Sequence, residues 1–539
     1  MSHLAHIARH PTSWLLSFLL ILAGCSDQLP TEPQITERLS APTLNANLQA
    51  TPPGYIRIGV VPSETSITIG GTGDFVVIAK ASGDQLLTGS NESIEVSLGG
   101  SAVATTNYRL QVSCTSAAGR DDLIARATAE GYETYAEDAG PCWRVMIGKF
   151  APDAAWSLRN NFRNEVIAKG LAGSDSFWKH VTVVEGATEY KVTYSGGTLT
   201  SEEPIVLKPV TGMVRIEGST YRGIAEVALN ASSALAGINE LPLEEYLYGV
   251  VPRELPPVPY GLLEAQKAQA VAARTYALAN MGKRKADGYD LLPTTSDQVY
   301  GGYEDEHPVS TAAVNGTAGV VAVYEGDLIT ALYHSTSGGF TANSEAVYTA
   351  TVPYLRGVPD AQRGKSLEHV PMEKVFKRAA NPKSLRAEKN GDFEADWSRY
   401  HRWYVYWTAD EIAAVVANSF NAPVTEVYEI NVVDRAALGR VQEIHFVTDA
   451  GTFVEHKDRI RTALKYYNAS GSQVSLRSTL FYIEPMTDST GAVGFQAWGG
   501  GWGHGVGMSQ TGAVGMAEKG ATYEEILKHY YRDIELETR

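Results

Sequence analysis

The chain has 539 residues, with 45 lysines and arginines against 61 aspartates and glutamates, and a net charge of −16. Its 44% hydrophobic content excludes a disordered chain, and its three cysteines exclude a disulfide scaffold. The acidic balance argues against nucleic acid as a partner, because phosphate binding needs clustered lysine and arginine. The length predicts about three folded units.

The first 25 residues have the pattern of an export signal. The run over 14–24 holds about ten apolar residues, too few to span a bilayer of roughly 30 Å but typical of a signal peptide. It ends in Leu22-Ala-Gly-Cys25, which resembles the lipobox of bacterial lipoproteins, in which the cysteine is acylated. An ordinary export signal with a chance cysteine is the alternative. We expect residues 1–25 to be a lipoprotein signal peptide, with Cys25 lipidated and the protein exported and anchored to the cell envelope, at the outer membrane or the periplasmic face in a two-membrane cell.

Residues 26–53 are rich in proline, threonine, glutamine and asparagine and have no periodic apolar pattern. Such a composition predicts a flexible linker that could hold the folded part away from the membrane.

A β-rich region follows the linker and is interrupted. Short alternating runs bounded by turn residues predict strands over 55–61, 74–80 and 93–98. Similar signals resume over 190–194 and 212–217. The intervening residues have a different pattern.

Residues 108–170 predict the order strand, helix, strand, helix. The strands lie over 108–114 and 143–150, and the second helix opens near Pro152 and ends at Gly170, with Ala155, Leu158, Phe162 and Val166 recurring at helical spacing.

This segment resembles a SPOR domain, through LQVS at 110–113, RVMIGKF at 144–150 and the alanine-containing helix that follows. The resemblance implies that residues 105–185 form a small ferredoxin-like βαβ module that binds peptidoglycan glycan strands free of stem peptides. A generic ferredoxin-like module would show much the same pattern. In an exported protein Cys114 and Cys142 could form a disulfide or remain free thiols.

An alanine-rich helix is predicted from 262 to about 280, and Lys267 and Arg274 project from one face of it. A surface row of ion pairs is the alternative role for these two cations. Glu254 precedes the helix, between Gly249-Val-Val-Pro and Leu-Pro-Pro, which predicts a rigid, apolar loop. A carboxyl group in such surroundings would have a raised pKa and could act as a general acid, although a lone loop glutamate is usually solvated.

Polar side chains follow in short loops. Gln298 and Tyr300 come after the helix, and a hairpin over 320–333 leads into residues 334–339, His-Ser-Thr-Ser-Gly-Gly. Residues 498–507 hold two tryptophans, a histidine and six glycines. They lack both nucleotide-binding glycine motifs and the GxSxG nucleophile elbow. Either they form a platform for a sugar, or they are a turn that packs Trp498 and Trp502 into the core.

These motifs together resemble the SpoIID/LytB family, named for stage II sporulation protein D. The motifs that carry the resemblance occur in order at 243–254, 264–277, 296–300, 334–339 and 501–510. The resemblance implies an α+β fold: a β-rich SpoIID-like core with a central alanine-rich helix. Its N-terminal β part would cover 55–104 and its catalytic part 188–536, with the motifs over 240–515 and the SPOR-like module inserted between the two parts.

Enzymatic members of this family are lytic transglycosylases, which cut the MurNAc–GlcNAc bond of peptidoglycan and leave 1,6-anhydro-MurNAc ends. The family's catalytic glutamate falls on Glu254, which would act as acid and then as base. No cofactor is expected, and a thiolate zinc site is not expected because no cysteine lies near the histidine loop, although His334 and His504 could still meet a metal. The residues expected to meet substrate are Lys267, Arg274, Gln298, Tyr300, His334, Ser337, Trp502, His504, Ser509 and Gln510.

Two other functions stay open. LytB-type relatives enhance a cell-wall amidase, so the protein could be a glycan-binding activator without turnover. A wall esterase using Ser337 or Ser509 with a histidine is the third reading, and it lacks a recognised elbow.

Overall fold

The computed structural model describes residues 54–99, 103–138, 142–173, 176–185, 189–361, 393, 398–487, 489 and 491–539. All of them belong to one unit, Asn45–Arg539. The predicted signal peptide, Cys25 and the linker over 26–53 lie outside the described residues, as do residues 362–392 and 394–397.

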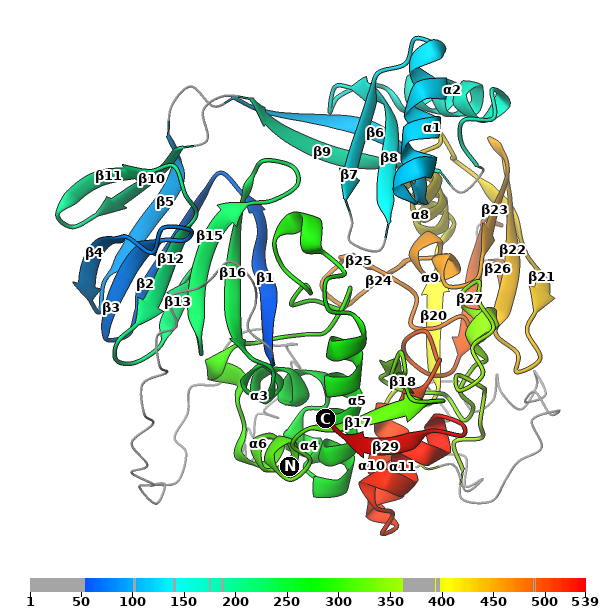
Figure 1. Cartoon of the computed structure of the whole chain (residues 1–539). Coiled ribbons are helices and arrows are strands. Elements are labelled where there is room, and N and C mark those ends of the chain that lie inside the picture. The colour runs from blue at the N-terminus through cyan, green and yellow to red at the C-terminus, as the bar shows by residue number, and fades with distance from the viewer. Residues whose placement is uncertain are drawn as a thin grey trace, which may run out of the picture. The chain divides into compact units, whose positions relative to one another are not determined.

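Two antiparallel sheets of six strands pack face to face. Their strand orders are β1-β16-β15-β12-β3-β4 and β11-β10-β5-β2-β13-β14. Figure 1 shows strands of the early chain (blue) and of the segment after residue 188 (green) interleaved in both sheets. The strands are β1 (Tyr55–Glu64), β2 (Ser66–Gly71), β3 (Asp74–Ala79), β4 (Gln85–Ser90), β5 (Ser93–Gly99), β10 (Glu189–Tyr194), β11 (Gly197–Ser201), β12 (Ile205–Pro209), β13 (Val214–Ile216), β14 (Ser219–Tyr221), β15 (Ile224–Leu229) and β16 (Leu235–Pro242).

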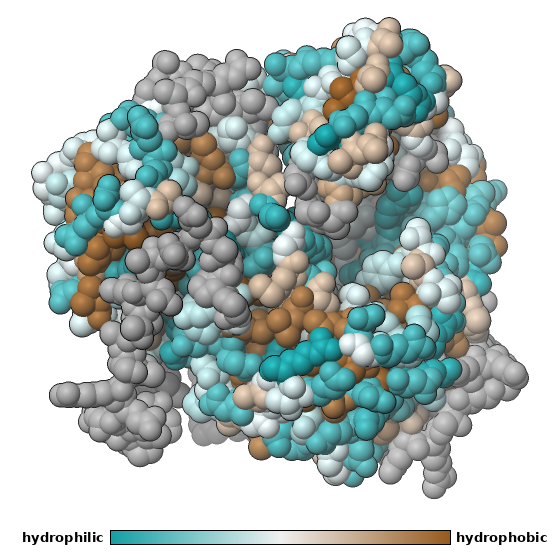
Figure 2. Space-filling model, viewed as in Figure 1, coloured by the Kyte–Doolittle hydropathy of each residue, from teal (hydrophilic) through white to brown (hydrophobic). Residues whose placement is uncertain are grey.

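Burial that alternates along the strands explains why the two sheets pack face to face as a β-sandwich. In β5, Ile94 and Val96 are buried while their neighbours face outward, so one side of the strand meets the opposite sheet. The common core joins Ile58 of β1, Ile67 of β2 and Val77 of β3. Hydrophobic residues are visible among these strands in Figure 2. The β-rich, mixed α+β character predicted from the sequence is confirmed.

A small module of strands and helices is inserted between β5 and β10. Its four strands form an antiparallel sheet in the order β7-β8-β6-β9. The expected order of strand, helix, strand, helix is incomplete, because β7 and β9 are also present. The elements are β6 (Val103–Thr115), α1 (Ala117–Ala129), β7 (Thr134–Asp138), β8 (Trp143–Phe150), α2 (Trp156–Ala168) and β9 (Phe177–Glu185).

The second helix of this unit differs from its prediction. It starts at Trp156, and Leu158 is 56% exposed. The helix buries Arg159 instead, with the guanidinium 3.7 Å from the ring centroid of Tyr108. A disulfide joins Cys114 to Cys142, linking β6 to the residue before β8.

A helical layer follows β16. The predicted alanine-rich helix is α5, and its small side chains allow α3, α6, α10 and α11 to pack against it. The helices of this layer are α3 (Leu243–Glu254), α4 (Pro257–Tyr260), α5 (Leu263–Ala279), η1 (Lys285–Asp287), η2 (Tyr303–Asp305), α6 (Pro308–Asn315), η3 (Ser344–Ala346), α10 (Gln510–Glu518) and α11 (Tyr523–Tyr530).

The expected hairpin over 320–333 is shorter than predicted. The strands β17 (Val320–Tyr324) and β18 (Asp327–Leu328) pair with each other, and β17 also pairs with β29 (Glu535–Thr538). The strand β19 (Tyr333–His334) instead pairs in parallel with β28 (Met508–Ser509).

The residues between β19 and β28 include a domain with its own hydrophobic core, which joins Trp407, Phe446 and Phe495. We call the segment from β20 to β27 the distal domain. Its elements are β20 (Trp403–Trp407), α8 (Ala409–Phe420), β21 (Val427–Arg435), β22 (Val441–Thr448), β23 (Gly451–His456), α9 (Arg459–Ala463), β24 (Tyr466–Tyr467), β25 (Gln473–Val474), β26 (Phe481–Thr487) and β27 (Val493–Gly499). In the described part of the chain no helix is long and apolar enough to cross a bilayer.

Candidate active site around Glu254

Glu254 is the last residue of α3, and not part of a loop as the sequence suggested. Pro252 lies inside the last helical turn, and the helix ends at Leu255 because Pro256 and Pro257 disfavour a helical conformation in the residues before them. The negative end of the helix dipole therefore lies at the carboxyl group, where it favours the protonated form.

The Glu254 carboxyl group is enclosed by protein. The backbone N–H of Val299 donates to its Oε1 at 2.6 Å. Burial raises the pKa of Glu254 to about 7, while hydrogen bonds from Val299, Tyr333 and Gln510 work in the opposite direction. Both the acid and the carboxylate form of Glu254 are therefore populated near neutral pH, and one group can both give and receive a proton.

Two distant segments supply the walls of this site. In the parallel pair of β19 and β28, Tyr333 lies opposite Met508 and His334 opposite Ser509. This pairing places Tyr333 and Gln510 beside Glu254. Gln510 also donates to Gln269 of α5 at 3.2 Å.

Gln298 holds Tyr333 in place. It is fully buried, and its amide donates to the Tyr333 hydroxyl at 3.0 Å and to the Ala273 carbonyl at 3.2 Å. Tyr300 is also buried and donates to Asn239 at 2.9 Å. Both residues were expected to meet substrate, and the structure places them behind the site.

The two histidines lie close together, with ring centroids 5.5 Å apart. His334 Nδ1 contacts the Val506 carbonyl at 3.2 Å, and His504 Nε2 contacts the Tyr333 carbonyl at 2.9 Å. Burial lowers the pKa of His504 to about 4 and that of His334 well below its usual value. Both rings are therefore neutral at neutral pH. Among the described residues, no group of three potential metal ligands gathers here.

The two serines make structural hydrogen bonds. Ser337 Oγ donates to buried Asp360 at 2.6 Å, and Asp360 also accepts from Tyr530 at 2.6 Å. Ser509 Oγ accepts from the N–H of Ser337 at 3.2 Å and caps α10 through Gly512 at 3.2 Å.

The loops that follow β19 and precede β28 meet backbone to backbone. Gly338 has φ +79°, and a Cβ atom there would lie 2.7 Å from the carbonyl carbon of Gly500. Gly505 has φ +84°, and a Cβ atom there would lie 2.0 Å from the guanidinium of Arg440. The glycines of these two motifs therefore permit close packing between the loops.

Lys267 and Arg274 have carboxylate partners other than Glu254. Lys267 pairs with Glu264 at 2.7 Å. Arg274 is 1% exposed, and both its Nε and its Nη2 lie 2.6 Å from oxygens of Glu244. Arg274 therefore joins α5 to α3.

The glycine-rich loop places its two tryptophans differently. Trp498 is 8% exposed and packs with Leu480, whereas Trp502 is 42% exposed and meets the Tyr400 ring at 4.4 Å between centroids. One tryptophan thus packs in the core and the other is available to a ligand.

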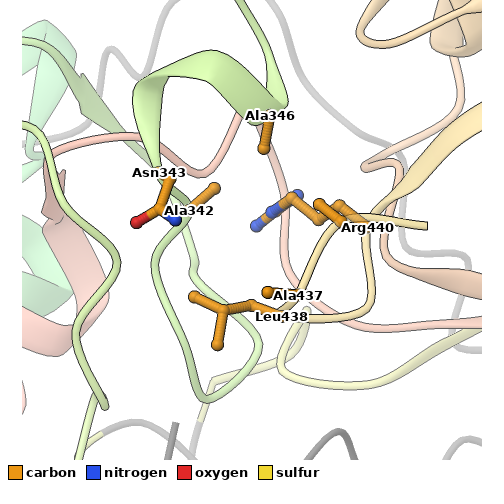
Figure 3. Close-up of a pocket in the computed structure, with 7 residues that line it drawn as sticks. Ala342, Asn343, Ala346, Ala437, Leu438 and Arg440 are labelled. Atoms are coloured by element: carbon orange, nitrogen blue, oxygen red, sulfur yellow. The ribbon is translucent and has the colours of Figure 1, made fainter. Parts of the chain in front are cut away.

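A small, mainly apolar pocket lies behind the loops (Figure 3). Arg440 enters it from one side, and η3 and the residues before it form the other. None of its seven lining residues was singled out as a site residue, and the Arg440 side chain donates to the Ser337 carbonyl at 3.3 Å. The residues that line the pocket therefore support the loop over 334–339 from behind.

The sequence reasoning missed three residues of the site. Tyr333 was seen only as the end of a strand, although it directly precedes the His334 motif. Neither Asp360 nor Tyr400 lies in a motif that could have drawn attention to it.

Comparison with known proteins supports the SpoIID/LytB family. The family model described as stage II sporulation protein matches residues 231–324, which include α3 and α5. A model of a domain of unknown function, DUF8618, matches residues 341–507.

Among individual proteins, the amidase enhancer of Bacillus subtilis (strain 168) is 30% identical over 380 residues, which are 65% of this chain and 50% of that protein. The stage II sporulation protein D of Bacillus amyloliquefaciens is 28% identical over 56% of this chain and 75% of its own length. An uncharacterised protein of Brachyspira hyodysenteriae is 29% identical over 66% of this chain and 82% of its own length. The chain thus spans about half the length of the amidase enhancer.

Proposed function

We propose that the protein is a peptidoglycan lytic transglycosylase that acts on glycan strands free of stem peptides. The observation that carries the proposal is the environment of Glu254: a carboxyl group at a helix end, enclosed by Val299, Tyr333 and Gln510, with a pKa of about 7.

Glu254 performs both proton transfers. Its acid form protonates the glycosidic oxygen as the bond from that oxygen to C1 of MurNAc breaks. The 6-hydroxyl oxygen of the same sugar then bonds to C1, and its proton passes to the Glu254 carboxylate. The acid form is restored without water or a second carboxylate, which hydrolytic glycosidases generally need. Tyr333 and Gln510 hold the carboxyl group during both steps.

The test is digestion of purified glycan strands, with and without stem peptides, followed by mass analysis of the products. We expect 1,6-anhydro-MurNAc ends, and a loss of about 10²- to 10⁴-fold in their rate of formation for Glu254→Gln. Glu345→Gln, which alters a carboxylate paired with Arg356, is the matched control and should leave the rate unchanged. Undiminished product from Glu254→Gln would refute the role of Glu254.

A second function is favoured by the name of one relative, the amidase enhancer. In that case the protein binds glycan and stimulates a cell-wall amidase without cutting a bond. This function would replace the first if no anhydro ends form and an added amidase releases stem peptides faster with this protein than without it.

The module over 105–185 is proposed to bind peptide-free glycan, and its sheet with two helices supports this reading. Deleting it should weaken binding to peptide-free strands, and retained binding would contradict the assignment. Cys25 is proposed to carry a lipid that anchors the exported protein to the envelope. Cys25→Ser should release the protein from membranes, and unchanged membrane association would contradict this role.

A further inference from the structure

The distal domain brings aromatic and cationic side chains to the glycine-rich loop. Its flanking residue Tyr400 meets Trp502 edge to face, with ring centroids 4.4 Å apart. The Arg477 guanidinium lies 4.7 Å from the Tyr400 ring centroid and 5.2 Å from that of Tyr466. Trp502, Tyr400, Arg477 and Tyr466 therefore form one continuous row, which we call the aromatic row.

Backbone hydrogen bonds fix this row to the loop. Gly501 N–H donates to the Tyr400 carbonyl at 2.9 Å, and Gly503 N–H donates to the Arg477 carbonyl at 2.8 Å. The Trp403 indole also donates to the Gly501 carbonyl at 2.9 Å. The residues on both sides of Trp502 are thus held by the distal domain, which makes the row a preformed surface.

The aromatic row lies beside the Glu254 site. Trp502 pairs with Thr336, three residues beyond Tyr333, which is about 10 Å along an extended chain. On the other side, burial and the nearby Tyr400 raise the pKa of Tyr260, in the helix that follows Glu254. A polymer seated at Glu254 therefore reaches the row with its neighbouring units.

Arg477 differs from two other arginines of the structure, Arg274 and Arg356. Arg274 and Arg356 each hold a carboxylate through two nitrogens. In the described part of the chain no carboxylate forms a salt bridge with Arg477, whose guanidinium instead lies over the rings of Tyr400 and Tyr466. A half-buried guanidinium on aromatic rings keeps its N–H donors available for a carboxylate ligand.

We propose that the aromatic row is a glycan subsite at which Trp502 packs against a pyranose ring and Arg477 binds the free carboxylate of a peptide-free muramic acid residue. This proposal rests on the proposed function. The apolar face of a sugar ring fits the exposed indole. The lactyl group of muramic acid is a carboxylate only when the stem peptide is absent, because the peptide is attached to it as a neutral amide. Through Arg477 the distal domain thus distinguishes peptide-free muramic acid from muramic acid that still carries its stem peptide.

Binding is measured by calorimetry on the full chain carrying Glu254→Gln, so that no ligand is consumed. The probes are a peptide-free GlcNAc–MurNAc tetrasaccharide and the same molecule with its carboxylates converted to methylamides. We expect the carboxylate form to bind about ten- to a hundredfold more tightly, as for one charge-assisted hydrogen-bonded pair.

Adding Arg477→Gln should remove this preference and leave the affinity for the methylamide unchanged, and Arg477→Lys should restore part of it. Adding Trp502→Ala should weaken the binding of both probes. Arg459→Gln is the matched control, because the exposed Arg459 pairs with Glu455 at 2.9 Å, and this variant should keep the preference. A preference of the module over 105–185 itself is the same in all variants, so the difference between each variant and the Glu254→Gln parent reports on the aromatic row alone.

Equal affinity for the two probes, or a preference that Arg477→Gln leaves undiminished, would overturn the subsite. A wild-type chain that forms no anhydro ends would overturn the proposed function instead, while these affinities would still decide the role of Arg477. The two failures are therefore distinguishable.

Discussion

Replacing Glu254 by glutamine should stabilise the protein, and only above pH 5. In the folded chain the pKa of Glu254 is about 7, against a usual value of 4.5. Between these values the unfolded chain is ionised at this position and the folded chain is protonated, so the free energy of unfolding falls as the pH rises. At about 1.4 kcal/mol per pH unit, the full loss is about 3 kcal/mol, reached near pH 8.

Glutamine cannot ionise, but it can still accept the hydrogen bond from Val299. The difference in unfolding free energy between Glu254→Gln and the wild type should therefore be near its minimum at pH 4.5 and about 3 kcal/mol larger at pH 8. Denaturant unfolding at several pH values measures this difference. The contributions of all other titrating groups cancel because both proteins contain them.

Glu345→Gln provides the control for this slope. A hydrogen bond from Arg356 lowers the pKa of Glu345, so its contribution is lost only as the pH falls below 4.5. From pH 5 to 8 its difference from the wild type should be constant. A constant difference for Glu254→Gln as well would show that Glu254 is an ordinary carboxylate and would refute the reasoning about its burial.

Three further changes test the supports of the site. Glu244→Ala leaves the buried guanidinium of Arg274 without its carboxylate and should lower the unfolding free energy by about 2–3 kcal/mol, measured with denaturant; a loss below about 0.5 kcal/mol would mean that the pair is unimportant. Replacing Cys114 and Cys142 together by serine removes a disulfide that closes a loop of 28 positions, and it should lower the unfolding free energy by about 3–4 kcal/mol. The loss should appear as faster proteolysis within the inserted module, and unchanged resistance to protease would argue against a stabilising bond. Gly505→Ala combines a left-handed backbone with a clash and should lower the Tm together with the rate of anhydro-end formation; an unchanged Tm would show that the loop adapts freely.

The sequence predicted the features that depend on local pattern. The alanine-rich helix agrees with its predicted bounds within a residue. The start of α11 likewise follows a local pattern, because Thr522 and Glu525 form a capping box there. Alternation predicted the longer strands well, because one face of each is buried in the sandwich.

Features that depend on distant partners escaped the sequence. Gln298 and Arg274 were assigned to substrate because polar residues in motifs suggest binding, yet each is buried by a partner at least 30 positions away. The helical end at Glu254 was taken for a loop, yet α3 continues through Pro252 to Glu254 before Pro256 and Pro257 end it. The raised pKa was anticipated, but the enclosing Tyr333 was not.

The parallel pairing of β19 with β28 has a consequence for when the site becomes active. Tyr333 and Gln510 belong to segments far apart in the sequence, and they enclose Glu254 only once β19 and β28 have paired. Until then Glu254 lies at the end of a solvated helix and keeps an ordinary carboxylate's acidity, so the acid form is held by about one molecule in three hundred at pH 7. On the proposed function, a newly exported or damaged chain in which this pairing has not formed would hold little of the acid that starts cleavage of the wall.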